Sequence, residues 1–441
     1  MGKITQVGLM AAAALALLGC TVAEDSVLPG KRETIAEAFG RAGDDLPENT
    51  ARQAQLDTVR QNTAWAQSHA TPSTRAAHPA LSSSLDLAWS TSIGQGDTRR
   101  QRITAQPVAA NGVVFTLDSA ARVTATSYDG TQVWTRDLTP PRERADEATG
   151  GALALGGGRL YVASAFGRLS ALDPATGAEI WTQRLGTTGT GAPTYYDGVV
   201  YIVSGDTTGW AIEADTGRLR WQIEALADIN NVAGGPAPAL TDKLAIFAFG
   251  SGELQATFRQ GGLRLWNVAL ASRRDGLALA LVDDITGHPV IRGNTVYAGN
   301  YSGSFTAIDV DDGTQKWTAP MGALGPAWVT RASVYLVSDL NELVRLDAKT
   351  GGVVWRSPLP GYIETRRPQA QRQGAYVHHG PLVAGSRVLV ASSDGVIRAF
   401  APDDGRLLAE TRVPGGATSA PIAVDGTYYV VTSRGELAAF R

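Results

Sequence analysis

Few side chains in this 441-residue sequence have the type and spacing that catalysis or metal binding requires. Five histidines are available: His69, His78, His288, His378 and His379. His378 and His379 are adjacent, and adjacent residues of a strand point to opposite faces, so this pair is poorly placed to hold one metal ion. No serine lies in a G-x-S-x-G motif. We therefore predict that the chain has no catalytic residues and no metal site.

The single cysteine, Cys20, is the residue with the clearest predicted chemistry. It follows Lys3 and an apolar run, residues 7–18, that is too short to span a membrane comfortably. A secretory signal that ends in small residues and then Cys resembles a bacterial lipobox, in which the peptide is cut before the Cys and the thiol carries diacylglycerol. Thr21 follows instead of Asp, which favours the outer membrane. We predict a signal peptide at residues 1–19 and lipidation of Cys20.

Composition excludes some function classes. The net charge is −3 and the basic residues are scattered, so the chain lacks the electrostatic signature of a nucleic-acid binder. Residues 20–84 are polar, with little apolar periodicity, and are predicted to be a tether with short helices near residues 31–39 and 49–61. Two basic stretches, residues 96–102 and 362–379, are predicted to be solvated loops.

From residue 85 onward, one phrase recurs. The stretch ALDPATGAEIW, residues 171–181, has blurred copies in which Gly stands four residues before Trp. The pairs are Gly130/Trp134, Gly177/Trp181, Gly217/Trp221, Gly262/Trp266, Gly313/Trp317 and Gly351/Trp355. A further copy keeps Gly405 but has Ala409 in place of Trp. A period of about 40–50 residues with four short strands per unit is typical of a β-propeller.

Eight such units fit into residues 85–441. The last unit ends after its third strand, whereas strand 85–93, which contains Trp89, has no unit of its own. We predict an all-β fold, an eight-bladed propeller with four antiparallel strands per blade. The N-terminal strand 85–93 joins the last blade and closes the ring, which removes open edges. Each Trp is predicted to lie on an outermost strand and to pack against the neighbouring blade.

The motif A-x-D-x-x-T-G-x-x-x-W, as in Ala171, Asp173, Thr176, Gly177 and Trp181, resembles the tryptophan-docking motif of pyrroloquinoline-quinone (PQQ) propellers. That family contains quinoprotein dehydrogenases and also non-enzymatic lipoproteins of the BamB type, which belong to the β-barrel assembly machinery (BAM complex). Both branches share the motif, so the resemblance implies the fold and leaves the function open.

The dehydrogenase branch implies PQQ held over calcium, an Asp base and often a vicinal disulfide. This sequence has no Cys-Cys pair, and its blades lack long insertions. The acidic run at residues 309–312 occupies the repeated turn, so we expect a solvated turn and not a calcium site. A PQQ-dependent dehydrogenase stays the alternative, and no bound cofactor is the prediction.

The BamB branch implies a scaffold lipoprotein that faces the periplasm from the outer membrane. The resemblance implies binding to the periplasmic POTRA region of BamA, and assistance to unfolded outer-membrane β-barrel clients. Exposed blade edges suit this task, because they can template strands by β-augmentation.

In that branch the contact with BamA uses loops between middle blades, which correspond here to residues 225–238 and 271–289. Asp284 matches the first Asp of an acidic family loop, and Asp283 can supply the charge lost at the next acidic position, where Thr286 stands. In the first loop the family has a Leu/Arg cluster, which is replaced by Asn230, Asn231 and Val232. Arg273 and Arg274 complete the candidate partner-binding residues. We expect both loops to be exposed.

Overall fold

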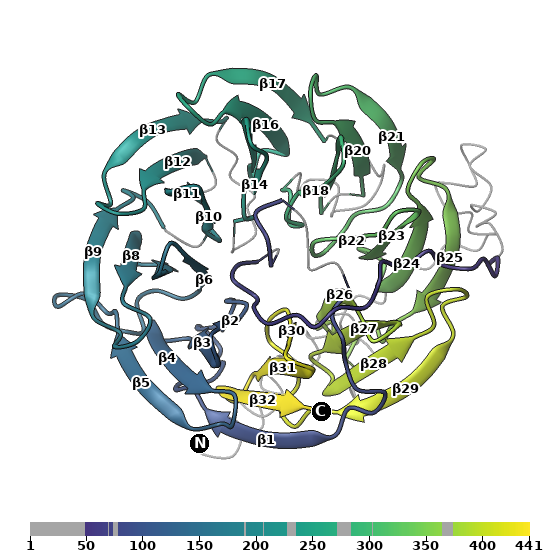
Figure 1. The fold of residues 1–441 in the computed structure, drawn as a ribbon, viewed down its shortest axis with the longest axis horizontal. Helices are drawn as coiled ribbons and strands as arrows, with labels where there is room; N and C mark the ends of the chain where they lie inside the picture. The colour runs from purple at the N-terminus through teal and green to yellow at the C-terminus, as the bar shows by residue number, and fades with distance from the viewer. Residues whose placement is uncertain are drawn as a thin grey trace, which may run out of the picture. The chain divides into compact units, whose positions relative to one another are not determined.

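Eight four-stranded antiparallel sheets are arranged in a ring in the computed structural model (Figure 1). The structure describes residues 49–441 except 69, 74–77, 189–190, 206, 227–234, 271–283, 302 and 364–373. The chain divides into two units, Met1–Leu46 and Pro47–Arg441, and all described residues belong to the second. The predicted all-β eight-bladed propeller is confirmed.

Each of the first seven blades is built from four consecutive strands, ordered from the ring centre outward. Blade 1 consists of β2 Val108–Ala110, β3 Val113–Leu117, β4 Arg122–Ser127 and β5 Gln132–Asp137, and blade 2 of β6 Gly151–Gly156, β7 Arg159–Ser164, β8 Arg168–Leu172 and β9 Glu179–Arg184. Blade 3 consists of β10 Thr194–Tyr196, β11 Val199–Ser204, β12 Thr208–Glu213 and β13 Leu219–Glu224, and blade 4 of β14 Ala239–Leu240, β15 Leu244–Ala248, β16 Glu253–Phe258 and β17 Arg264–Ala269. Blade 5 consists of β18 Val290–Arg292, β19 Thr295–Gly299, β20 Phe305–Asp309 and β21 Gln315–Ala319. Blade 6 consists of β22 Trp328–Val329, β23 Ser333–Val337, β24 Glu342–Asp347 and β25 Val353–Pro358. Blade 7 consists of β26 His378–Ala384, β27 Arg387–Ser392, β28 Val396–Phe400 and β29 Leu407–Arg412.

Blade 8 closes the ring with strands from both ends of the propeller. Its inner strands are β30 Ile422–Val424, β31 Thr427–Thr432 and β32 Glu436–Phe440, and its outer strand is β1 Leu87–Ser92. β1 pairs with β32 in the antiparallel register Trp89↔Ala439 and Thr91↔Leu437. The predicted closing strand is therefore confirmed.

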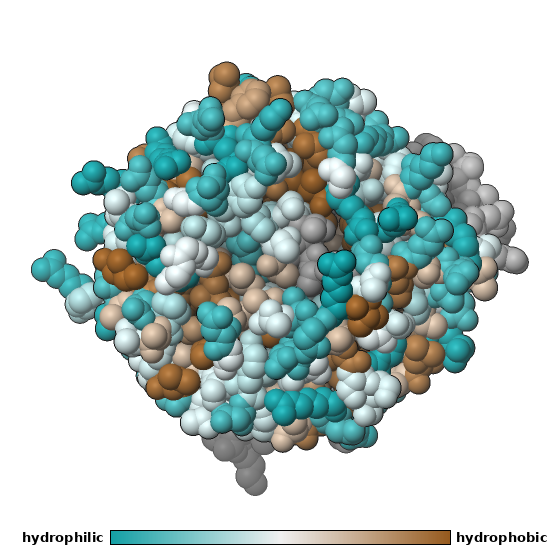
Figure 2. All heavy atoms as spheres, viewed as in Figure 1, coloured by the Kyte–Doolittle hydropathy of each residue, from teal (hydrophilic) through white to brown (hydrophobic). Residues whose placement is uncertain are grey.

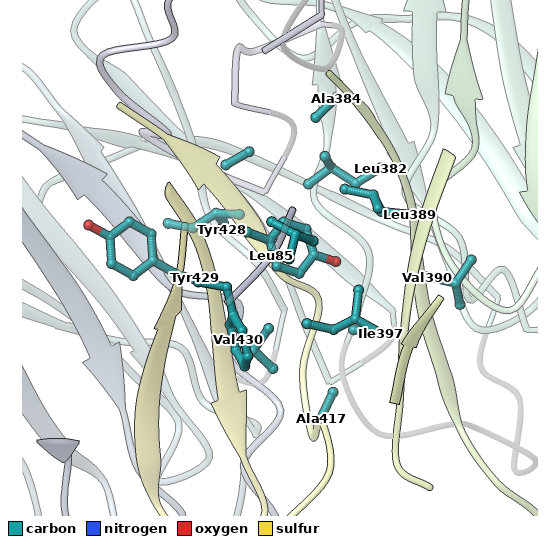
Figure 3. Packing of buried hydrophobic residues seen from close by; sticks show 14 of the residues in the cluster. Leu85, Leu382, Ala384, Leu389, Val390, Ile397, Ala417, Tyr428, Tyr429 and Val430 are labelled. Atoms are coloured by element: carbon teal, nitrogen blue, oxygen red, sulfur yellow. The ribbon is translucent and has the colours of Figure 1, made fainter. Parts of the chain in front are cut away.

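The apolar core lies between adjacent sheets. β11, β15, β23 and β31 are buried along their whole length, whereas the outer strand β13 has only exposed and half-buried residues. Figure 3 shows part of the cluster between blades 7 and 8, where Leu382, Leu389 and Ile397 lie beside Tyr428 and Leu85. The described residues contain no helix that is long and apolar enough to cross a membrane.

The antiparallel order gives the ring two different faces. We call the face with the first-to-second and third-to-fourth turns of each blade the turn face. The opposite side, the connector face, has the second-to-third turns and the segments that join one blade to the next, because each blade has four strands.

Residues 49–84, which we call the strap, differ from the predicted tether. They cross the turn face at the centre of the ring (Figure 1, purple). The strap exchanges hydrogen bonds of 2.5–3.0 Å with every blade, at Ala109, Leu155, Tyr195, Leu240, Ile291, Val354, Gly385 and Asp425. The expectation of a free polar tether is therefore wrong for these residues.

The helix predicted near residues 49–61 is also absent, for the same reason. Its backbone groups pair with distant turns and not with each other: the Thr50 N–H donates to the Val354 carbonyl at 2.9 Å and the Arg52 N–H donates to the Asp403 carbonyl at 3.2 Å. Arg345, which is buried in blade 6, donates in turn to the carbonyl of Arg52. Extended backbone that satisfies its groups on the propeller needs no helix.

Candidate functional site

The repeated phrase forms a tryptophan-docking joint between blades. In blade 2, the Trp181 indole N–H donates to the Ala214 carbonyl of the next blade at 2.9 Å. The ring packs on Gly217, where an added Cβ would lie 2.7 Å from the indole. Gly217 has a φ of 72°, which favours glycine at this turn. The phrase thus needs Gly both for the turn and for the space that the indole takes.

The same joint recurs at seven blade boundaries. Each indole N–H donates to a carbonyl in the third-to-fourth turn of the next blade at 2.8–3.2 Å: Trp89 to Tyr128, Trp134 to Pro174, Trp181 to Ala214, Trp221 to Arg259, Trp266 to Val310, Trp317 to Ala348 and Trp355 to Pro402. The predicted packing of each Trp against the neighbouring blade is confirmed.

Ala409 marks the eighth boundary, and the topology explains why Trp is missing there. The next blade is blade 8, whose third and fourth strands come from opposite ends of the propeller. The docking turn is replaced by two chain segments that exchange hydrogen bonds, Asp86 N–H to Arg441 carbonyl at 2.8 Å and Arg441 N–H to Asp86 carbonyl at 2.9 Å. An indole at position 409 would therefore have no turn glycine to pack on.

The central channel is the enclosed space in which a propeller of this type would hold a small molecule. It has a volume of about 260 Å³. Every blade contributes to its lining, and Ser68 of the strap contributes as well. Its titratable side chains among the described residues are His288, His378 and His379.

Burial lowers the pKa of two of the channel histidines. The ring nitrogens of His378 lie 2.7 Å from the Ser392 Oγ and 2.8 Å from the Pro360 carbonyl, and burial lowers its pKa. Burial, with the neighbouring His378 as a smaller cause, lowers the pKa of His379 to about 4. His288 Nδ1 accepts the Ala237 N–H at 2.6 Å. The predicted opposite orientation of adjacent strand residues agrees with these separate environments.

The channel does not fit a quinone held over calcium. Calcium takes oxygen ligands, chiefly carboxylates. The described lining contains no Asp, Glu, Lys or Arg, so it offers neither carboxylates for the cation nor cationic groups for an anionic quinone. Within the part of the chain that the structure describes, no group of three or more His, Cys, Asp and Glu side chains could hold a metal ion.

Most of the predicted partner residues lie outside the described residues: Asn230, Asn231, Val232, Arg273, Arg274 and Asp283, together with the lipidation site Cys20. Both loops that contain the partner residues join consecutive blades, so their described ends belong to the connector face.

Asp284 is described, and the expectation that it is exposed is wrong. Its exposed fraction is 5%. Its main-chain carbonyl accepts the Tyr301 N–H at 2.9 Å, and the next residue, Ile285, belongs to the core between blades 4 and 5. The chain therefore enters the ring at Asp284, before the end of the predicted loop at residue 289.

The basic stretch at residues 96–102 is built into the seam between blades 8 and 1. The Asp97 carboxylate accepts the Ile103 N–H at 2.8 Å and the Thr418 hydroxyl at 2.8 Å, and Arg102 lies 3.4 Å from it. Gln101 is buried and donates to the Ala145 carbonyl. Arg99 and Arg100 are exposed, as expected of a solvated loop.

The strap is the feature that sequence reasoning missed. Trp65 lies at its centre and is fully buried, with its ring centroid 6.5 Å from that of Trp328. An isolated Trp in a polar segment was the available signal, because an indole buries a large area and is rarely left in a free tether.

The fold and the sites together define an eight-bladed propeller of the tryptophan-docking type. The strap crosses the centre of its turn face, and the described lining of its channel has no Asp, Glu, Lys or Arg. Comparison with known proteins gives the family. The family model described as outer membrane protein assembly factor BamB matches residues 119–357 and 345–441. The chain belongs to this family.

Individual relatives are distant but match most of the chain. The outer membrane protein assembly factor BamB of Escherichia coli (strain K12) is 23% identical over 354 residues, which cover 79% of this chain and 86% of that protein. BamB of Xanthomonas campestris is 26% identical over 368 residues, which cover 81% and 86%.

Solved structures share the fold. The crystal structure of BamB from Moraxella catarrhalis aligns with a TM-score of 0.67 at 17% identity and covers 81% of this chain and 100% of that one. The quinohemoprotein alcohol dehydrogenase from Comamonas testosteroni aligns with a TM-score of 0.64 at 17% identity and covers 86% and 81%. Both solved structures therefore share the propeller architecture of this chain, and the architecture alone does not separate an assembly factor from an enzyme.

Proposed function

We propose that this chain is a non-enzymatic scaffold subunit of the outer-membrane β-barrel assembly complex. In this proposal Cys20 carries the lipid that holds the protein to the outer membrane, with the propeller in the periplasm. The propeller binds the POTRA region of BamA and assists the insertion of unfolded β-barrel clients. The observation that carries the proposal is the BamB family match over residues 119–441.

The uncharged channel supports a non-enzymatic role. A PQQ-dependent dehydrogenase needs carboxylates for its calcium ion and its base, and the described lining of the channel contains no Asp or Glu. We expect PQQ with calcium neither to raise the melting temperature nor to support alcohol oxidation. A saturable rise in melting temperature would contradict this part of the proposal, because a ligand that binds only the folded state must stabilise it.

The occupied turn face supports a contact on the other side of the ring. The strap crosses the centre of the turn face and bonds to all eight blades, so this face has little free backbone at its hub. The two candidate loops, residues 225–238 and 271–289, belong to the connector face. We propose that Asp283, Arg273, Arg274, Asn230, Asn231 and Val232 meet the POTRA region, whereas Asp284 anchors the end of its loop.

A binding assay with purified POTRA domains tests this assignment. The variant with Arg273→Glu, Arg274→Glu and Asp283→Lys reverses three charges of one loop, and we expect its affinity to fall by about tenfold or more. Asp311→Lys, at an exposed turn on the opposite face, is the matched control and is expected to bind normally. Equal affinity of both variants would place the contact elsewhere.

Asp284 requires a different readout. Because it is buried, Asp284→Lys is expected to lower the melting temperature before it affects binding. An unchanged melting temperature with lost POTRA binding would instead mean that Asp284 touches the partner directly.

A further inference from the structure

The first described residues of the strap lie along the outer edge of blade 6 and bond to its backbone groups. The N–H of Thr50 donates to the carbonyl of Val354 on β25 at 2.9 Å. The N–H of Arg356 donates to the Asn49 side-chain oxygen at 2.9 Å, and the Asn49 amide donates back to the Arg356 carbonyl at 2.8 Å. The first described residues of the strap therefore satisfy backbone groups that a sheet edge otherwise leaves unpaired.

The burial of one repeated position also differs at this edge. In each outer strand the residue before the docking Trp lies at a register shift, where it adds an extra residue to the strand. In blade 6 this residue is Val354, which is only 4% exposed. In blades 1, 2, 4 and 7 the equivalent residues are Val133, Ile180, Leu265 and Leu408, with exposed fractions of 53%, 47%, 41% and 42%. Figure 2 shows small, separate hydrophobic patches near the rim, among hydrophilic side chains.

We propose that the edge of β29 in blade 7 is a docking site for an extended segment of another polypeptide, added to the sheet as residues 49–50 are added to β25. The register supports this equivalence. Leu359 and Val413 each follow the docking position, Trp355 or Ala409, by four residues. Each donates its N–H inward, to the residue just before the third strand of its own blade. With a period of two, the outward groups are the carbonyl of Leu408 and the N–H of Glu410.

Three features favour blade 7 among the edges of this kind. Leu407 and Leu408 are both exposed, which gives two apolar contacts at one edge. Ala409 is exposed, so no indole occupies the place of a docking Trp. The Glu410 carboxylate is held by the Arg398 guanidinium at 3.1 Å, inside its own blade, so the backbone at this position faces outward without a competing side chain.

The expected occupant is an extended segment with alternating apolar and polar residues. Its backbone would supply hydrogen bonds to the Leu408 carbonyl and the Glu410 N–H, and one apolar side chain would cover Leu408. The inference rests on the proposed function for the source of such segments, since unfolded barrel strands alternate in this way. The choice of the β29 edge depends only on the structure of the propeller and not on the proposed function.

A photo-crosslinking experiment tests the site with the full-length protein. The probe is a short fluorescent peptide of alternating Val and Thr with a central benzoylphenylalanine. We expect crosslinks to map to residues 407–412, and we expect Leu408→Lys to weaken binding by about tenfold, since a charge blocks strand addition at an edge. Leu340→Lys, at an exposed leucine away from any outer strand, is the matched control and should bind normally. Crosslinks that map away from blade 7, or unchanged binding by Leu408→Lys, would overturn the proposal.

A second peptide separates strand addition from simple apolar contact. Methylation of alternate backbone nitrogens removes the donors and keeps the side chains, so binding should be lost. Equal binding of the methylated peptide would refute backbone pairing. POTRA binding by Leu408→Lys is expected to stay normal, so a failure at this edge and a failure of the partner assignment give different patterns.

Discussion

Replacing Trp65 with Ala should weaken the whole propeller, although the residue lies in a segment that reads as a tether. A buried indole removes about 150–250 Å² from water, which is worth ~4–6 kcal/mol at ~25 cal/mol per Å². Residual burial in the unfolded chain lowers this to ~3–5 kcal/mol. The buried indole N–H has no acceptor among the described residues, and this offsets ~1–3 kcal/mol. We therefore expect Trp65→Ala to reduce the free energy of unfolding by about 2 kcal/mol, the difference between the middle values of these two ranges.

Urea denaturation followed by circular dichroism measures this change. Trp65→Phe is the matched control, because it keeps one aromatic ring against Trp328 and removes the unpaired N–H. We expect it to stay within about 1 kcal/mol of the natural protein. If Trp65→Ala unfolds at the same urea concentration as the natural protein, the strap contributes no packing energy and the reasoning fails.

Deleting residues 85–93 removes the outer strand of blade 8 and should cause aggregation or a large fall in melting temperature, and a normal melting curve would contradict closure by β1. The stability of the propeller should also fall in acid: the folded His379 has a pKa of about 4 and the unfolded one about 6.5, so the unfolded chain binds the extra proton. The free energy of unfolding should therefore drop by about 3 kcal/mol in total between pH ~6.5 and ~4, and His379→Gln should flatten this dependence. Cys20→Ala should abolish recovery in outer-membrane fractions, and unchanged fractionation would contradict lipid anchoring.

The propeller could be predicted because its main joints are local to the repeat. Asp173, Thr176 and Gly177 form their turn from neighbouring backbone, as the Asp173 carboxylate accepts the Ala175 N–H at 2.8 Å. Trp181 then donates to the turn of the next blade, and that turn is formed by the next copy of the same motif. The spacing of the repeats also predicted the closing strand. The last unit lacks a fourth strand, and the N-terminal strand 85–93 belongs to no other unit, so the two complete one blade.

The candidate site could be predicted only in part. The prediction that the two loops join middle blades follows from their order in the repeat. Asp284 was expected on an exposed loop, because the sequence does not say where a connector of that length enters the core. The structure buries Asp284 next to Ile285, at the boundary between blades 4 and 5.

The sequence by itself determined the number of blades, the tryptophan joints and the absence of an indole at Ala409, since each depends on residue types at a fixed period. The tertiary structure alone decided that residues 49–84 are part of the propeller. Thr50 pairs with Val354, and Asn62 with Asp425, across more than 300 residues, and these bonds use backbone groups that every residue type has. No side-chain pattern records such pairing. It becomes visible only when the ring brings the turns of all eight blades to one hub.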